Sequence, residues 1–351
     1  MSDRGTAYGS EFGFELRVCA WAERRWPARA GRPVVVARQL GTRERRWDTV
    51  ILECDPEGLE RRARFGADEL DSDLLHVVRH APGDWAWYRD ALPDPGYPWR
   101  YVREAVHRAA ERGVVETRRD GNRIELRRKW AYPDWVRRVV AVENKPDLDA
   151  SAAAALAEQA ERDVALGLAD EVWVATEATG ERVEPIVLED LPDAAGVLAF
   201  DFDAVDPATV LWHPRGLDPD RPGTRVVERP AGGPRDLSAA RFEYVDPGEK
   251  AATRRELAER AYGRGWRSYV DTMRSDCASF HLRRARAGYA PWCAAKEREQ
   301  TAAECSGSCP AFAPEQPAWR TRGWPLEGGP GASMRRALSR RRERRRPDAD
   351  V

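Results

Sequence analysis

Short apolar runs along the chain alternate with segments in which apolar residues recur every three or four positions. The short runs are rich in β-branched residues and bounded by polar residues or glycine, so they predict buried strands. They cover residues 34–37, 47–53, 139–142, 171–176 and 196–200. Helical spacing predicts helices over 11–26, which Pro27 ends, and 149–168, which Asp149 caps. Strands that alternate with helices predict an α/β core with a mixed sheet.

A long insertion separates the strand at 47–53 from the strand at 139–142. Within it, residues 99–112 have helical spacing that ends at Gly113, and residues 114–128 alternate on both sides of Asp120-Gly121. An Asp-Gly pair between alternating segments is a strong hairpin signal. A helix followed by a basic hairpin suggests a winged helix, a common nucleic-acid-binding unit. The alternative is a structural insertion that happens to be basic.

These patterns divide the chain into five parts. We expect a nuclease-like α/β core, an inserted winged-helix-like subdomain, a Pro/Gly/Arg-rich linker, a helical Cys-rich module and a disordered basic tail. In that order they cover residues 1–54 with 133–215, then 55–132, 216–248, 249–315 and 316–351. The arginine cluster at 335–346 is either a phosphate-binding segment or a solvated tail.

Composition changes this picture in two ways. Only four of the 58 basic residues are lysines, which makes a lysine beside a candidate site notable. No apolar run reaches the length of a membrane span, and the N-terminus lacks the apolar core of a signal peptide. We therefore expect a soluble cytoplasmic protein that does not bind membranes.

Candidate catalytic residues lie at the ends of two predicted core strands. Glu143 and Lys145 follow the apolar run at 139–142, and strand alternation predicts that they share a face. Asp48 begins the strand at 47–53. Two carboxylates from neighbouring strands can hold Mg²⁺ or Mn²⁺, and a lysine beside such an ion can stabilise charge on a phosphate. The alternative is a salt-bridged strand end at the surface.

An Asp followed by Glu-x-Lys on the next core strand resembles the PD-(D/E)XK nuclease superfamily, over residues 11–205 apart from the insertion. The resemblance implies a restriction-endonuclease-like core, with a mixed central sheet flanked by helices, and a metal-dependent nuclease. It places Asp48, Glu143 and the carbonyl of Asn144 at the metal, and Lys145 beside the attacking water.

Two further residues fit this resemblance. Glu15 lies in the helix before the Asp strand, where many members carry an auxiliary glutamate, and Gln159 lies where exonuclease-like members carry a glutamine. Each is otherwise an ordinary exposed helix residue. The chain departs from the family pattern where Trp47 replaces proline, where Asp163 replaces the tyrosine of Gln-x-x-x-Tyr, and in the wide spacing from Asp48 to Glu143.

Four of the six cysteines cluster near the C-terminus, at Cys277, Cys293, Cys305 and Cys309. Four thiolates suit either Zn²⁺ or a [4Fe–4S] cluster, and the long gaps favour iron–sulfur. Some nucleases that resemble this chain bind such a cluster with one cysteine from the N-terminal helix, where Cys19 lies. Cys19 is otherwise a buried small apolar residue. His281 is either a substitute ligand or a helix-surface residue, and we expect Cys54 to be structural.

Together these features predict a metal-dependent nuclease that hydrolyses DNA, with water activated at Mg²⁺. A non-catalytic DNA-binding or regulatory protein on a decayed nuclease fold is the alternative. A hydrolase of another phosphate ester is a third, because the site chemistry does not identify its substrate.

Overall fold

We analysed a computed structural model of the chain. It describes residues 7–27, 31–42, 45–94, 96–178, 191–228, 241–266, 277–285, 288–299, 309–311 and 313. The predicted tail at 316–351 and Cys305 lie outside these residues.

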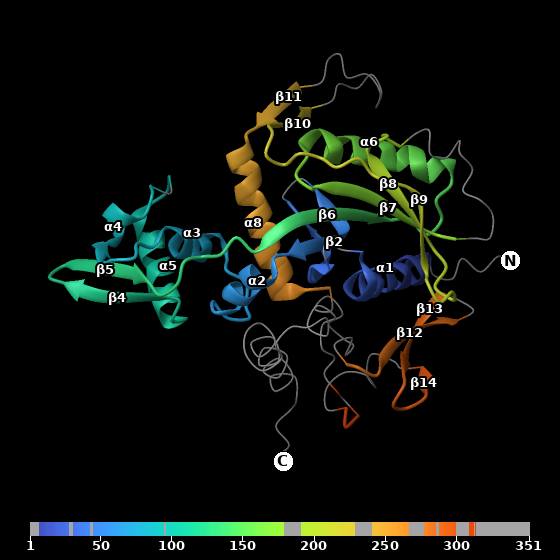
Figure 1. Cartoon of the computed structure of the whole chain (residues 1–351), viewed down its shortest axis with the longest axis horizontal. Coiled ribbons are helices and arrows are strands. Elements are labelled where there is room, and N and C mark those ends of the chain that lie inside the picture. Colours follow the sequence, from blue (N-terminus) through green and yellow to red (C-terminus); the bar gives the residue numbers. More distant parts are fainter. Residues whose placement is uncertain are drawn as a thin grey trace.

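A six-stranded mixed sheet forms the centre of the molecule (Figure 1). Its strands β6, β7 and β8 are parallel, and the other neighbouring pairs are antiparallel. In spatial order the strands are β1 (Val34–Gly41), β2 (Arg46–Cys54), β6 (Val136–Asn144), β7 (Glu171–Glu177), β8 (Ala195–Phe200) and β9 (Ala208–Trp212). The predicted α/β class with a mixed central sheet is confirmed.

Helices cover both faces of this sheet, because its inner strands are apolar on both sides. Helix α1 (Ala7–Arg25) packs on one face, where Phe14 and Val18 contact the buried side chains of β6 and β8. Helices α6 (Ala150–Leu166) and α8 (Pro247–Arg264) cover the other face.

The ends of α6 follow the sequence signals. The side chain of Asp149 accepts a hydrogen bond from the N–H of Ala152, which confirms it as the N-cap. Gly167 ends the helix with φ of 57°, a left-handed conformation that glycine adopts without steric cost.

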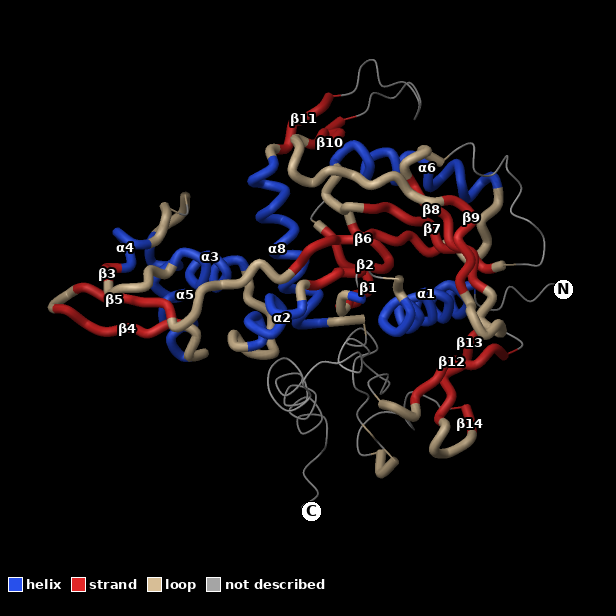
Figure 2. Tube along the Cα trace, viewed as in Figure 1, coloured by secondary structure: helices blue, strands red, loops and turns tan. Residues whose placement is uncertain are grey.

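The insertion forms a lobe beside the sheet with an apolar core of its own (Figure 2). The predicted helix and hairpin are both present, and Gly121 in the hairpin turn has φ of 59°. The elements are α2 (Pro56–Ala63), α3 (Ser72–His80), β3 (Ala86–Trp87), α4 (Tyr88–Ala91), α5 (Trp99–Glu111), β4 (Val115–Asp120) and β5 (Arg123–Arg128). The three strands form a small sheet in the order β3-β5-β4.

Two expectations about the C-terminal half are wrong. The expected linker contains an antiparallel ribbon of β10 (Gly223–Glu228) and β11 (Arg241–Val245). The second segment alternates charged with aromatic residues and the first contains three β-branched residues, and this strand propensity outweighs the prolines and glycines around them.

The Cys-rich module is also less helical than expected. After α8 the structure has a three-stranded antiparallel sheet of β12 (Phe280–Ala285), β13 (Gly288–Cys293) and β14 (Arg298–Glu299). Aromatic residues every few positions mimic helical spacing in the sequence, but Phe280 pairs with Cys293 across a hairpin. His281 is therefore an exposed strand residue and not a helix residue.

Within the described part of the chain, no helix has both the length and the apolar character that a membrane crossing requires.

Candidate active site

The register of three adjacent strands brings the predicted site residues together. Thr49 of β2 lies opposite Val142 of β6. Because these strands are antiparallel, Asp48, which precedes Thr49, lies beside Glu143, which follows Val142. On the other side of β2, Thr49 lies opposite Arg38 of β1, which sets Gln39 beside Asp48. One row across the sheet thus contains an amide and two carboxylates.

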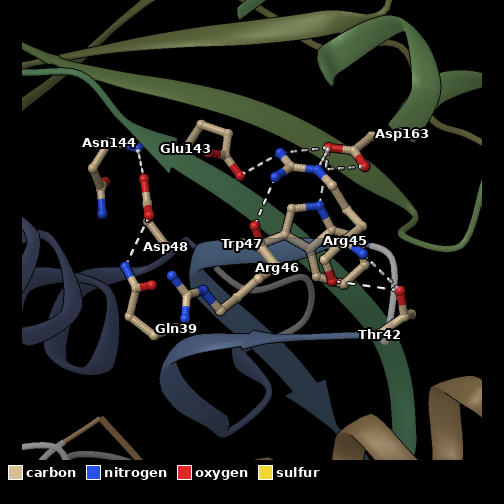
Figure 3. A network of polar contacts seen from close by, with 9 residues as sticks. All are labelled: Gln39, Thr42, Arg45, Arg46, Trp47, Asp48, Glu143, Asn144 and Asp163. Atoms are coloured by element: carbon tan, nitrogen blue, oxygen red, sulfur yellow. Dashed lines mark hydrogen bonds and ion pairs between the residues drawn. The ribbon is translucent and has the colours of Figure 1, made fainter.

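Both carboxylate oxygens of Asp48 are held by neighbouring strands (Figure 3). Its Oδ2 accepts a hydrogen bond from the backbone N–H of Asn144 at 2.9 Å, and its Oδ1 accepts one from Nε2 of Gln39 at 2.9 Å. Asp48 is half-buried, so these bonds fix the orientation of a carboxylate that is still reachable from outside.

Gln39 links Asp48 to the N-terminal helix. Its Nε2 also donates to Oε1 of Glu15 at 2.7 Å, and Glu15 forms an ion pair of 2.9 Å with Arg38. The backbone of Gln39 has φ of 51°, which is uncommon for a residue other than glycine and is found often at functional sites. Sequence reasoning missed Gln39, because a polar residue in a half-buried strand carries no distinctive signal.

The two glutamates of the site hold their protons more tightly than usual. The pKa of Glu143 is raised to about 8, chiefly by burial and also by the negative charge of Asp48, against the lowering effect of Arg45. Burial likewise raises the pKa of Glu15 to about 7, against the lowering effect of Arg38 and Gln39. A bound cation would relieve this crowding of negative charge.

Arg45 occupies one side of Glu143 (Figure 3). Its Nη2 lies 2.5 Å from Oε1 of Glu143 and 3.0 Å from Oδ2 of Asp163, a residue of α6. Trp47 also donates to Asp163, at 3.0 Å. The position of Arg45 depends on Gly41, because the two backbones approach closely. A Cβ at position 41 would lie only 2.0 Å from the carbonyl oxygen of Arg45, so glycine is required there.

Sequence reasoning missed the roles of Arg45 and Asp163. The only signal was the departure at 163, where the family pattern has tyrosine. In the structure Asp163, on α6, forms an ion pair with Arg45, which directly precedes β2.

Asn144 and Lys145 complete this end of β6. The side chain of Asn144 donates to Thr49, and its Oδ1 is buried without a hydrogen bond from any residue that the structure describes. Lys145 is half-buried directly after the strand, and its N–H donates to the carbonyl of Ala175 at 2.8 Å. The strand therefore brings Glu143, Asn144 and Lys145 to the edge where Asp48 lies.

Not every expected residue lies at this site. Gln159 is exposed on α6, one turn before Asp163, and the site's glutamine is instead Gln39. Across the described ranges, no group of three or more histidine, cysteine, aspartate or glutamate side chains is arranged to hold a metal ion. Asp48 and Glu143 lie side by side in adjacent strands, and the carboxylate of Glu143 contacts Arg45.

Three of the four clustered cysteines are among the described residues, and one of them, Cys293, lies in the small C-terminal sheet. Cys277 is buried and lies three residues before Phe280, whose partner across the hairpin is Cys293. Cys309 is half-buried, and Ala313 near it donates to Sγ of Cys277 at 3.5 Å. This contact places the segment after Cys309 beside Cys277, but the three described thiols are not arranged as a group that could hold a metal ion.

Cys19 and Cys54 lie elsewhere. Cys19 is buried in α1, with its Sγ 3.3 Å from Oγ1 of Thr49, and Cys54 is buried in β2, where its thiol donates to the carbonyl of Leu52 at 3.4 Å. Burial raises the pKa of both thiols. In this structure both are buried core residues, as a structural role predicts.

A comparison with protein families matches residues 35–314, most of the chain, to a model described as "Family of unknown function (DUF5787)". The chain belongs to this family. The matched DUF5787 segment contains Asp48, Glu143, Lys145 and the four clustered cysteines, whereas Glu15 and Cys19 precede it. No curated protein matches the chain, and no solved structure matches it.

Proposed function

We propose that this protein is a metal-dependent nuclease of the PD-(D/E)XK type that hydrolyses DNA phosphodiester bonds. The observation that supports this most is the side-by-side placement of Asp48 and Glu143 in adjacent strands, with the pKa of Glu143 raised to about 8. Two desolvated carboxylates side by side in adjacent strands repel each other, and a cation between them is the simplest compensation.

The donor set suits Mg²⁺ or Mn²⁺. Magnesium sites in phosphate-processing enzymes need only one or two carboxylates, and waters and substrate oxygens complete the coordination. Asp48 and Glu143 would hold the ion with the carbonyl of Asn144. When bound, such an ion lowers the pKa of a coordinated water and polarises a phosphoryl oxygen.

The protein's own residues prepare this site. Gln39 and the N–H of Asn144 orient Asp48, so its carboxylate needs little rearrangement to bind. Glu143 must release both its proton and Arg45 before it can coordinate an ion. Lys145, next to this pair, would stabilise negative charge that develops on the scissile phosphate.

The insertion would supply DNA binding. From α3 onward its chain order is helix, strand, two helices and hairpin, and its first strand pairs with the last, as in a winged helix. In that arrangement α5 would enter the major groove, and its exposed face carries Arg100, Tyr101, Arg103 and His107. On the outer face of the hairpin, Arg118 and Arg127 stack over Trp85, and Arg123 stacks over Trp87.

The C-terminal cysteines would hold a structural Zn²⁺ or a [4Fe–4S] cluster. Cys293 belongs to a sheet of only three strands and Cys277 directly precedes it; such a sheet is small for an independent core, and a bound metal would add stability to it. The absorption spectrum of anaerobically purified protein separates the two metals, because a cluster is brown and zinc is colourless.

A direct test is incubation of linear and circular DNA with the protein, with and without Mg²⁺ or Mn²⁺. We expect cleavage that needs the ion and disappears in Asp48→Asn and Lys145→Ala proteins. Asp90→Asn is the matched control, because Asp90 is exposed in the insertion. Equal cleavage by wild type and both site variants would overturn the proposal.

One observation favours a second candidate, a DNA-binding protein without catalysis. Arg45 already contacts the carboxyl group of Glu143 at 2.5 Å, so its guanidinium would act as a permanent replacement for a metal. Calorimetric titration with Mn²⁺ separates the two functions. Binding that Asp48→Asn removes favours the nuclease, whereas DNA binding without any Mn²⁺ binding favours the second candidate.

A further inference from the structure

A pocket of about 270 Å³ lies on the outer side of α1. The loop at 202–207, Trp266 and the start of β12 form its other walls. Its size is at the small end for ligand pockets, about right for one small molecule. No role in the proposed nuclease reaction uses it.

Helical geometry separates this pocket from the carboxylates. Arg17, Trp21 and Arg24 line it, and their spacing of four and three residues places them on one side of α1. Glu15, which contacts Gln39 at the candidate active site, precedes Arg17 by two residues and so lies about 200° around the helix. The pocket and the carboxylates thus lie on opposite sides of α1.

The lining is basic. Arg17, Arg24, Arg25 and His281 contribute to it, and no acidic residue is among the described residues that line it. The loop contributes Phe202, Ala204, Val205 and Pro207, while its aspartates are not part of the lining. Two of the arginines are positioned by this loop: Arg17 donates to the carbonyl of Phe202 at 3.2 Å, and Arg25 donates to that of Val205 at 2.5 Å.

The lining is also aromatic. Phe202 and Phe280 are half-buried at the pocket. Arg17 lies 4.0 Å from the ring centre of Phe202, and Phe200 stacks on the same ring with centroids 5.0 Å apart. Phe280 is therefore the ring whose face a base can contact. Trp21 and Trp266 form the buried floor.

We propose that this pocket binds one nucleotide, with its phosphate on the arginines and its base against the ring of Phe280. Guanidinium groups match phosphate oxygens in a bidentate geometry, and aromatic rings stack on bases of any sequence. The nucleotide is either free or an unpaired unit of a nucleic-acid strand. Only the second source rests on the proposed nuclease function.

Calorimetry on the full chain in EDTA tests the site without cleavage. The probes are a deoxynucleoside 5′-monophosphate, the same deoxynucleoside, inorganic phosphate and a short single-stranded oligonucleotide. We expect the monophosphate to bind about tenfold or more tightly than either the nucleoside or phosphate alone, since both walls contribute. Equal affinity for all three, or no binding, would overturn the proposal.

Two conservative variants locate the binding. Phe280→Leu removes the ring but keeps an apolar side chain, and Arg25→Gln removes an exposed charge, so both should fold. We expect each to weaken monophosphate binding about tenfold with an unchanged melting temperature. Phe242→Leu and Arg89→Gln are the matched controls on other exposed surfaces. Wild-type affinity in both pocket variants would overturn the assignment.

The oligonucleotide distinguishes the two sources. If a strand enters the pocket, Phe280→Leu weakens oligonucleotide binding and raises KM for single-stranded DNA without a change in kcat. If only the monophosphate responds to the variant, the ligand is a free nucleotide. Failure of the nuclease proposal is separate, because Asp48→Asn would then cleave DNA as fast as wild type, or wild type with Mg²⁺ would not cleave it, while nucleotide binding in EDTA persists.

Discussion

Arg45 and Arg62 each hold a buried glutamate, but their surroundings differ. Arg62 of α2 and Glu259 of α8 are both fully buried, and Nε of the arginine lies 2.7 Å from Oε1 of the glutamate. The remaining donors of Arg62 reach the carbonyls of Gly66 and Asp68, and Glu259 also accepts from Tyr132. This network joins the insertion to the core and leaves no room for a ligand.

The pair of Arg45 and Glu143 is an open version of the same contact. The side chain of Arg45 is 17% exposed, and a second carboxylate, that of Asp48, lies beside Glu143. Burial is the main reason that the pKa of Glu143 is raised to about 8. The difference teaches that an arginine on a buried glutamate is structural when every polar atom is satisfied, as at Arg62. Where a second carboxylate lies beside the pair, as at Arg45, we expect a cation to displace the guanidinium.

The largest expected effect is on activity at the open pair. Asp48→Asn should lower Mg²⁺-dependent cleavage on the order of 10³-fold, because the amide removes one of two charges that hold the ion. The melting temperature should change little, since the amide keeps one acceptor for Gln39 or Asn144. Cleavage within a few-fold of wild type would contradict the open pair as a catalytic site.

The closed pair should dominate stability. Arg62→Ala leaves Glu259 as a buried unpaired charge, and we expect a loss of about 3–5 kcal/mol in the free energy of unfolding measured with urea. The double variant Arg62→Met with Glu259→Leu should recover most of it, because apolar residues of similar size replace the pair. A loss below about 1 kcal/mol would place Arg62 with the exchangeable pairs.

Arg45→Ala sharpens the comparison. It leaves Asp163 without its ion partner, so we expect a loss of about 1–3 kcal/mol in EDTA. Added Mn²⁺ should restore stability, since the ion now binds Glu143 without displacing a guanidinium. The same Mn²⁺ should not rescue Arg62→Ala. Equal responses of the two variants would remove the distinction between them.

The pH dependence of stability should reveal the open pair. The pKa of Glu143 is raised from its ordinary value of 4.5 to about 8, so the folded protein keeps a proton that the unfolded chain releases. Stability from this group is therefore complete below pH 4.5 and is lost as the pH rises through 8. Urea unfolding in EDTA should show this decline in wild type relative to Glu143→Gln. A parallel pH profile for the two proteins would contradict it.

The smallest expected effects separate two glutamines. Gln39→Ala should lower cleavage about tenfold, because Gln39 orients Asp48 and Glu15. Gln159→Ala should leave cleavage and stability unchanged, within about 0.5 kcal/mol for unfolding, because Gln159 is exposed. The reverse order would restore Gln159 to the site.

The sequence by itself determined the core elements and three of the candidate residues. Burial on both faces demands continuous apolar runs, so the strands around Val50, Val140 and Val174 are visible without a structure. The placement of Asp48, Glu143 and Lys145 at strand ends follows from the same runs. The hairpin at Gly121 is equally local, because its turn chemistry depends on two residues.

Only the tertiary structure decided which polar groups meet at the site. Gln39 reaches Glu15 and Asp48 through strand pairing and an unusual φ angle, and Arg45 reaches Asp163 across 118 residues of sequence. Such contacts have no periodicity that a linear pattern reveals. The same reason explains the errors after Leu217: in weakly apolar segments, the pairing partner decides between linker, helix and strand.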